Sequence, residues 1–150
     1  MTAVVIGVGN EYRRDDGAAV EVIGRLRRRH LPGVNLAVTD GEPSRLMDLW
    51  EGADLVIVVD AIHIEPSVPG RVHTIVVEQT SLQAPSTASS HGLGLGEAVE
   101  LARTLGRLPA RLIIIGMEGA DFSVGPGLTP AVGERVQDAV DLVVAQLDRY

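Results

Sequence analysis

Short apolar runs of strand length recur along the chain, and stretches with helical spacing separate them. Five of these runs predict strands, at residues 3–9, 34–39, 54–61, 71–78 and 111–117. The run at 54–61 contains five consecutive aliphatic residues, which is typical of a central parallel strand buried on both faces. The run at 71–78 alternates apolar and polar residues, so we expect that strand near an edge of the sheet.

Between these runs, apolar residues return every three or four positions. This spacing predicts a helix over 16–30, one that Ser44 caps, one from Leu95 to Gly106, and a long terminal helix after Thr129-Pro130. Strands that alternate with helices predict an α/β fold. We therefore expect one domain over residues 1–150, a three-layer αβα sandwich around a mostly parallel five-stranded sheet.

The loop after the first strand is the most informative stretch. Gly7-Val8-Gly9-Asn10 joins the strand to the helix, at the sheet edge where open α/β proteins place their sites. Tyr12 stands where a dinucleotide-binding loop has its third glycine, and the carboxylates of Asp15 and Asp16 would repel a phosphate. This acidic pair suits a cation or proton transfer, although helix capping alone would explain one of the two.

Two further polar residues stand where loops leave apolar elements. Asp60 ends the central strand, and His91 precedes a glycine- and leucine-rich segment. With Asp16 they would give two carboxylates and one imidazole, a set that suits nickel or zinc. Asp60 could instead cap a turn and His91 could be an ordinary loop residue, and His63 could replace His91 as a ligand.

The remaining polar residues near this edge have less direct interpretations. We expect Glu11 and Asp15 to orient the loop and Asp40 to lie at the rim of the site. We expect His30 and His73 to be surface residues.

Composition narrows the function further. The chain has no cysteine, which excludes disulfides, cysteine-protease chemistry and thiolate metal sites. A net charge of −7 and 3% aromatic residues argue against a nucleic-acid binder, and the basic residues at 25–29 suit the end of a helix. Neither a secretory leader nor a membrane-spanning run is visible, so we expect a cytoplasmic protein.

Four motifs occur in order along the chain: Gly7-Val8-Gly9-Asn10 followed by Asp15-Asp16, Val59-Asp60-Ala61, Ser90-His91-Gly92-Leu93-Gly94-Leu95, and Gly127-Leu128-Thr129-Pro130. Together they resemble the hydrogenase maturation endopeptidases, which trim the C-terminal tail of the nickel–iron hydrogenase large subunit. The likeness covers nearly the whole chain.

The resemblance implies a specific site and partner. Asp16, Asp60 and His91 would be both the nickel-contacting and the catalytic residues, and the nickel would come with the hydrogenase large-subunit precursor, so that no tightly bound cofactor is expected. The family also implies one antiparallel strand, for which residues 71–78 are the candidate. We expect a monomer that binds neither nucleic acid nor membrane.

The chain departs from the family pattern at two points. Asp16 stands where glutamate is common, which shortens the side chain by one methylene. Glu42-Pro43-Ser44 follows Asp40-Gly41, where the family often has a second glycine and a threonine. This difference bears on the identity of the substrate.

Two other functions are compatible with these residues. The chain could be a metal-binding checkpoint or chaperone module that docks on a metalloenzyme precursor without cutting it. It could also be a nucleotide-binding module that uses Gly7-Val8-Gly9, although Asp15 and Asp16 argue against that.

Overall fold

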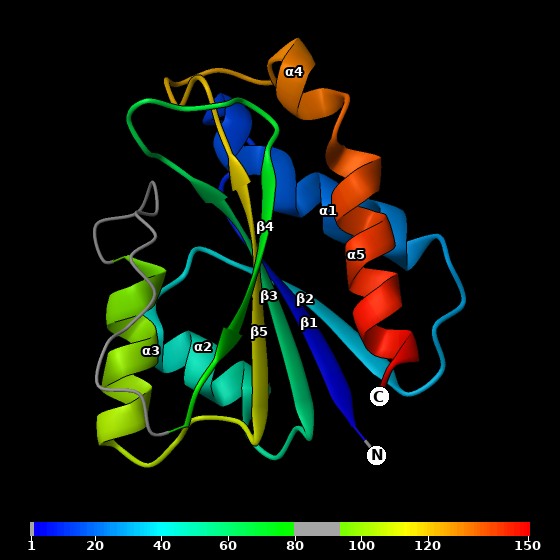
Figure 1. Cartoon of the computed structure of the whole chain (residues 1–150), viewed down its shortest axis with the longest axis vertical. Helices are drawn as coiled ribbons and strands as arrows, with labels where there is room; N and C mark the ends of the chain where they lie inside the picture. Colours follow the sequence, from blue (N-terminus) through cyan, green and yellow to red (C-terminus); the bar gives the residue numbers. More distant parts are fainter. Residues whose placement is uncertain (1, 80–93) are drawn as a thin grey trace.

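The computed structural model describes residues 2–79 and 94–150 as a central sheet covered by helices on both faces (Figure 1). The strands are β1 (Ala3–Val8), β2 (Val34–Thr39), β3 (Leu55–Ile62), β4 (Val72–Val77) and β5 (Arg111–Glu118). The helical segments are the 3-10 turn η1 (Arg14–Gly17), α1 (Ala18–Arg27), α2 (Pro43–Trp50), α3 (Leu95–Thr104), α4 (Pro130–Gly133) and α5 (Val136–Asp148).

The sheet is mixed, with the order β2-β1-β3-β5-β4. β1 pairs in parallel with β2 and β3, and β3 pairs in parallel with β5. β4 runs antiparallel to β5 at the sheet edge. The expected α/β sandwich and the choice of the fourth strand as the antiparallel edge strand are therefore confirmed.

Two apolar layers fill the space between the sheet and the helices. Val5, Ile57 and Ile115 face α1 and α5, whereas Ile6, Val58 and Ile114 face α2 and α3. Successive side chains of a strand point to opposite faces, so the continuous aliphatic runs serve both layers at once. Trp50 closes the second layer, and its indole N–H donates to the carbonyl of Arg107 at 2.9 Å.

Three helix boundaries differ from the sequence prediction. The helix expected over 16–30 begins as η1 and continues as α1, which ends at Arg27. Glu42, rather than Ser44, caps α2, because its carboxylate accepts from the backbone N–H groups of Ser44 and Arg45. The terminal helix is divided into α4 and α5 at residues 134–135.

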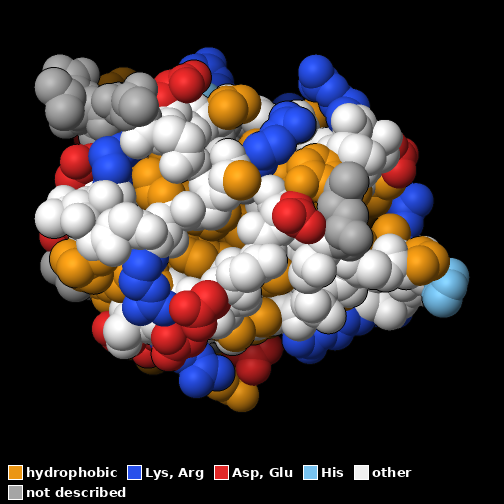
Figure 2. Space-filling model, turned by 90° about the horizontal axis from the view of Figure 1, so that it is seen from below, with side chains coloured by type: hydrophobic (Ala, Val, Ile, Leu, Met, Phe, Trp, Pro, Cys, Tyr) orange, Lys and Arg blue, Asp and Glu red, His pale blue; other side chains and the backbone are white. Residues whose placement is uncertain are grey.

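The two ends of the parallel strands differ in their surroundings. Viewed from the amino ends, the surface mixes acidic, basic and apolar side chains (Figure 2). Arg107 pairs there with Asp48 and Glu51, both well exposed. The carboxyl ends of β1, β3 and β5 instead meet η1, α4 and the loops between them (Figure 1).

Within residues 2–79 and 94–150, no helix combines the length and apolar character that a membrane span requires.

Gly9 allows the turn after β1 to lie against η1. A Cβ atom at Gly9 would lie 2.0 Å from the backbone oxygen of Asp16. We expect Gly9→Ala to lower the free energy of unfolding by about 2 kcal/mol or more, because the backbone must move to relieve the overlap. Urea unfolding of the purified variant measures this loss.

Gly24→Ala is the matched control, because Gly24 lies inside α1 and a Cβ there meets nothing within 4 Å. The same substitution should stabilise the protein by about 0.5–1 kcal/mol, since alanine loses less backbone entropy in a helix. Equal effects at the two positions would contradict the close packing of Gly9.

Candidate active site

Asp16 and Asp60 lie at the carboxyl edge of two adjacent strands. Asp60 is opposite Val8 in the β1–β3 register, and two residues later the N–H of Asn10 donates to the Asp16 carboxylate at 2.9 Å. η1, which carries Asp16, also contacts β3. Both residues are almost completely buried, at 1% and 4% exposure. The pairing of the strands therefore places both residues at the same edge of the sheet.

The histidine of the expected set cannot be placed in the same way. His91 lies outside the described residues. His63 follows β3, is exposed, and stacks on Phe122 with ring centroids 4.9 Å apart. Across residues 2–79 and 94–150, no three His, Asp or Glu side chains form a group that could hold a metal ion. The structure thus does not join His63 to Asp16 and Asp60 in such a group.

Asp15 has a different role from its neighbour. Its buried carboxylate accepts hydrogen bonds from the N–H groups of Ala120, Asp121 and Thr129 at 2.8–3.0 Å, and from the Thr129 hydroxyl at 2.9 Å. Its own N–H donates to the carbonyl of Asp121. Asp15 therefore joins η1 to both ends of the loop between β5 and α4. These bonds fix the position of η1, which follows the loop after β1.

Further backbone bonds fix the turn that leads to Asp16. The side-chain oxygen of Asn10 accepts from the N–H of Tyr12 at 2.9 Å. Gly125 then bridges this turn to the loop after β5, because its N–H donates to the Tyr12 carbonyl and its carbonyl accepts from Arg14. The site is consequently supported by backbone contacts between two segments that are far apart in sequence.

Glu118 is a buried acid that the sequence analysis did not select. It ends β5 and is 1% exposed. Its carboxylate accepts from the N–H of Val68 at 2.8 Å and lies 2.6 Å from Nε2 of His73 and 3.7 Å from Nε of Arg71. The sequence pattern that identified Asp60 could also have identified Glu118, because both are acids at the end of an aliphatic strand. His73, expected at the surface, is half-buried by this contact.

Several interactions determine the ionisation of Glu118. Desolvation of the buried carboxylate raises its pKa, but the hydrogen bonds from Val68 and His73 and the charges of His73 and Arg71 lower it more. The pKa therefore lies below its ordinary value of 4.5. Glu118 is thus a charged anchor for the segment between β3 and β4.

Asp40 and Glu42 lie at the end of β2. Asp40 is exposed and accepts from the N–H of Glu42 at 3.1 Å. Hydrogen bonds from the Ser44 hydroxyl and from the backbone N–H groups of Ser44 and Arg45 lower the pKa of Glu42. These hydrogen bonds to Glu42 show how the stretch Glu42-Pro43-Ser44 begins α2.

Sequence comparison relates this chain to known proteins. The sequence profile described as hydrogenase maturation protease matches residues 20–146. Hydrogenase 2 maturation protease of Escherichia coli is 28% identical over 98% of this chain and 91% of its own length. The hydrogenase expression/formation protein HupD of Bradyrhizobium diazoefficiens is 31% identical over 98% of this chain and 78% of its own length.

The solved structures give the same result. The hydrogenase maturating endopeptidase HybD from E. coli superposes with a TM-score of 0.79 and 26% identity, covering 99% of this chain and 93% of that one. An endopeptidase from E. coli solved in solution superposes with a TM-score of 0.83 and 25% identity, over 99% of this chain and 93% of that one. Fold and sequence thus define a protease of the α/β class, and the chain belongs to the hydrogenase maturation protease family.

Asp15→Asn tests the anchor between η1 and the loop after β5. In the wild type, backbone N–H groups donate to both oxygens of the Asp15 carboxylate. In the variant, the amide replaces one of these oxygens with an NH₂ group, which cannot accept a hydrogen bond from them. We expect the free energy of unfolding to fall by roughly 2–3 kcal/mol, because buried donors lose their acceptor. Asp48→Asn, a change on an exposed side chain, should stay within about 0.5 kcal/mol. Indistinguishable urea unfolding curves for the two variants would contradict the anchor.

Glu118→Gln tests the charged anchor through its pH dependence. Because folding lowers the Glu118 pKa, the ionised group stabilises the fold above about pH 4.5, and this contribution disappears as the pH falls through the folded-state pKa. The variant should therefore be less stable than the wild type near pH 7, and the two should converge in acid. Urea unfolding measured from pH 7 down to pH 3 provides the comparison, and a difference independent of pH would contradict the assignment.

Proposed function

We propose that this protein is an endopeptidase that removes the C-terminal extension of a nickel-loaded [NiFe]-hydrogenase large-subunit precursor. The observation that carries the proposal is the pair of buried carboxylates, Asp16 and Asp60, at the ends of neighbouring strands. Membership of the maturation protease family supports the reaction class, as does the likeness to a structure titled hydrogenase maturating endopeptidase.

The nickel belongs to the substrate in this proposal. Asp16, Asp60 and His91 contact it, so that only a precursor that has received its metal presents the scissile bond correctly. In the sequence, His91 stands shortly before Leu95, where α3 begins.

Peptide hydrolysis needs a group that accepts a proton from the attacking water. With no cysteine in the chain, the carboxylates are the candidates, and either Asp16 or Asp60 can act as this general base. The substrate nickel would polarise the scissile carbonyl. Water then adds to the carbonyl carbon, and the amine of the extension leaves with a proton as the C–N bond breaks.

Asp16→Asn and Asp60→Asn should each abolish processing, because an amide neither accepts the proton nor attracts the cation. The assay is mass spectrometry of a candidate large-subunit precursor after incubation, with nickel loaded and with nickel omitted. The wild type should release a C-terminal peptide from the loaded precursor only. Asp48→Asn, on the opposite end of the sheet, should process at the wild-type rate.

His91→Ala should likewise abolish cleavage of the loaded precursor while the far-ultraviolet circular dichroism stays unchanged. Wild-type rates for any of the three variants would remove that residue from the mechanism. An intact precursor that nevertheless binds the wild type in a nickel-dependent manner would replace the protease with the checkpoint module.

A further inference from the structure

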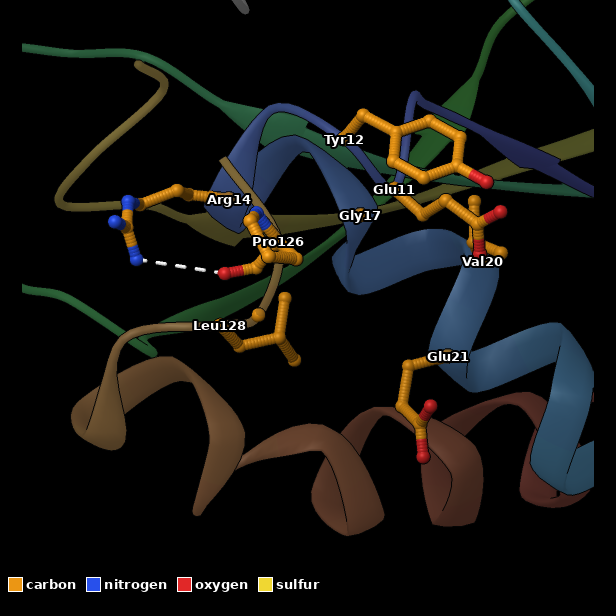
Figure 3. A pocket seen from close by; sticks show the side chains of 9 residues that line it. Glu11, Tyr12, Arg14, Gly17, Val20, Glu21, Pro126 and Leu128 are labelled. Atoms are coloured by element: carbon orange, nitrogen blue, oxygen red, sulfur yellow. Dashed lines mark hydrogen bonds between the residues drawn. The ribbon is translucent and has the colours of Figure 1, made fainter. Parts of the chain in front are cut away.

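A pocket of about 340 Å³ opens beside the turn that carries Asp16 (Figure 3). One wall comes from the turn before η1 and from α1, and the other comes from residues 126–128 before α4. A Cβ atom at Gly17 would lie 2.9 Å from Cα of Glu11, so the Glu11 backbone packs directly on the residue after Asp16. The pocket therefore borders the segment that carries Asp16.

The walls of the pocket combine apolar surface with acidic groups. Val20, Pro126 and Leu128 provide the apolar part, and Glu11 and Glu21 provide the carboxylates. Glu21 already accepts from Arg25 on α1 at 3.2 Å. Glu11 is exposed and has no ion pair with any residue in 2–79 or 94–150. The Glu11 carboxylate is thus available to a ligand.

Arg14 also lines the pocket, but its charge is engaged elsewhere. Its guanidinium donates to the carbonyl of Pro126 at 3.4 Å and lies 3.6 Å from Asp121. Figure 3 shows the side chain extending to the far side of Pro126, away from Glu11. Arg14 adopts a φ of 45°, a conformation uncommon for a residue with a side chain, and its N–H donates to Gly125. The backbone therefore holds this cation away from the acidic wall.

Tyr12 completes the acidic side of the pocket. Its ring is 66% exposed and projects with Glu11 toward α1 (Figure 3). An aromatic face beside a carboxylate suits a cation, which gains from the ring quadrupole and from the opposite charge. The apolar wall suits the aliphatic stem of the same side chain. The chemistry of the pocket thus fits lysine or arginine.

We propose that this pocket binds a lysine or arginine side chain of the hydrogenase large-subunit precursor, in the polypeptide that flanks the scissile bond. This assignment rests on the proposed function, since it needs the precursor as partner. The pocket's size fits one long side chain with its adjacent backbone. Glu11 and Tyr12 are specificity-determining residues in this assignment, and they take no part in bond cleavage.

Glu11→Gln removes the charge and keeps the shape of the side chain. We expect KM for the nickel-loaded precursor to rise about tenfold with kcat unchanged, because binding is lost equally in the ground and transition states. The effect should shrink as salt is raised from 50 to 500 mM. Glu51→Gln, which removes a well-exposed charge at the other end of the sheet, should leave KM unchanged.

A charge exchange identifies the partner residue. Each lysine and arginine near the C-terminus of the precursor is changed to glutamate in turn. One such precursor should be processed poorly by the wild type and regain about tenfold in kcat/KM with Glu11→Arg. An unchanged KM for Glu11→Gln, or no precursor rescued by Glu11→Arg, would overturn the pocket assignment while wild-type cleavage still stood.

The pocket can still be tested if the protein turns out not to be a protease. If the wild type cleaves no precursor, the Kd of the intact complex replaces KM as the readout. A tenfold weaker Kd for Glu11→Gln than for Glu51→Gln would then support the pocket without the protease. Equal Kd values would overturn it.

Discussion

The site depends on the hydrogen bonds that the Asp15 carboxylate accepts from the loop between β5 and α4. A buried carboxylate is stable only when several donors surround it, and here backbone N–H groups of Ala120, Asp121 and Thr129 satisfy that requirement. The same bonds hold η1 against this loop and thereby help to set the position of the next residue, Asp16. Two adjacent acids thus have separate tasks, since one organises the backbone and the other lies at the site.

Most of the architecture could be predicted from local patterns, because the strands are central and strongly apolar. The aliphatic run of β3 indicated burial on both faces, and the polar positions of β4 indicated an edge. Asp60 could be selected because an acid that ends such a run needs an explanation. Glu118 ends β5 in the same way, but its partners, Val68 and His73, lie about 45–50 residues earlier in the chain. Only the fold brings them together.

Other features of the structure could not be predicted from local sequence patterns. Glu42 takes the capping position that the sequence assigns to Ser44, since its longer side chain reaches two N–H groups at once. The interruption between α4 and α5 directly follows Gly133, but a single glycine inside a helical pattern does not by itself predict a break. The Glu11 pocket was also invisible in the sequence, because its two walls are more than a hundred residues apart and are joined by long-range bonds such as those of Gly125 and Arg14.

The hydrogen bond between Asp15 and Thr129 joins residues 114 positions apart in the sequence. This separation determines when the site can form during folding. A long loop must close before such a contact forms, and its entropic cost is met only when the intervening sheet exists. During synthesis, β1, α1 and β3 emerge early, yet the carboxylate at position 15 lacks its full set of donors until residues 120–129 have left the ribosome. Completion of the site therefore waits for the loop that follows β5, so that a truncated or nascent chain can carry both Asp16 and Asp60 without the backbone arrangement that positions them.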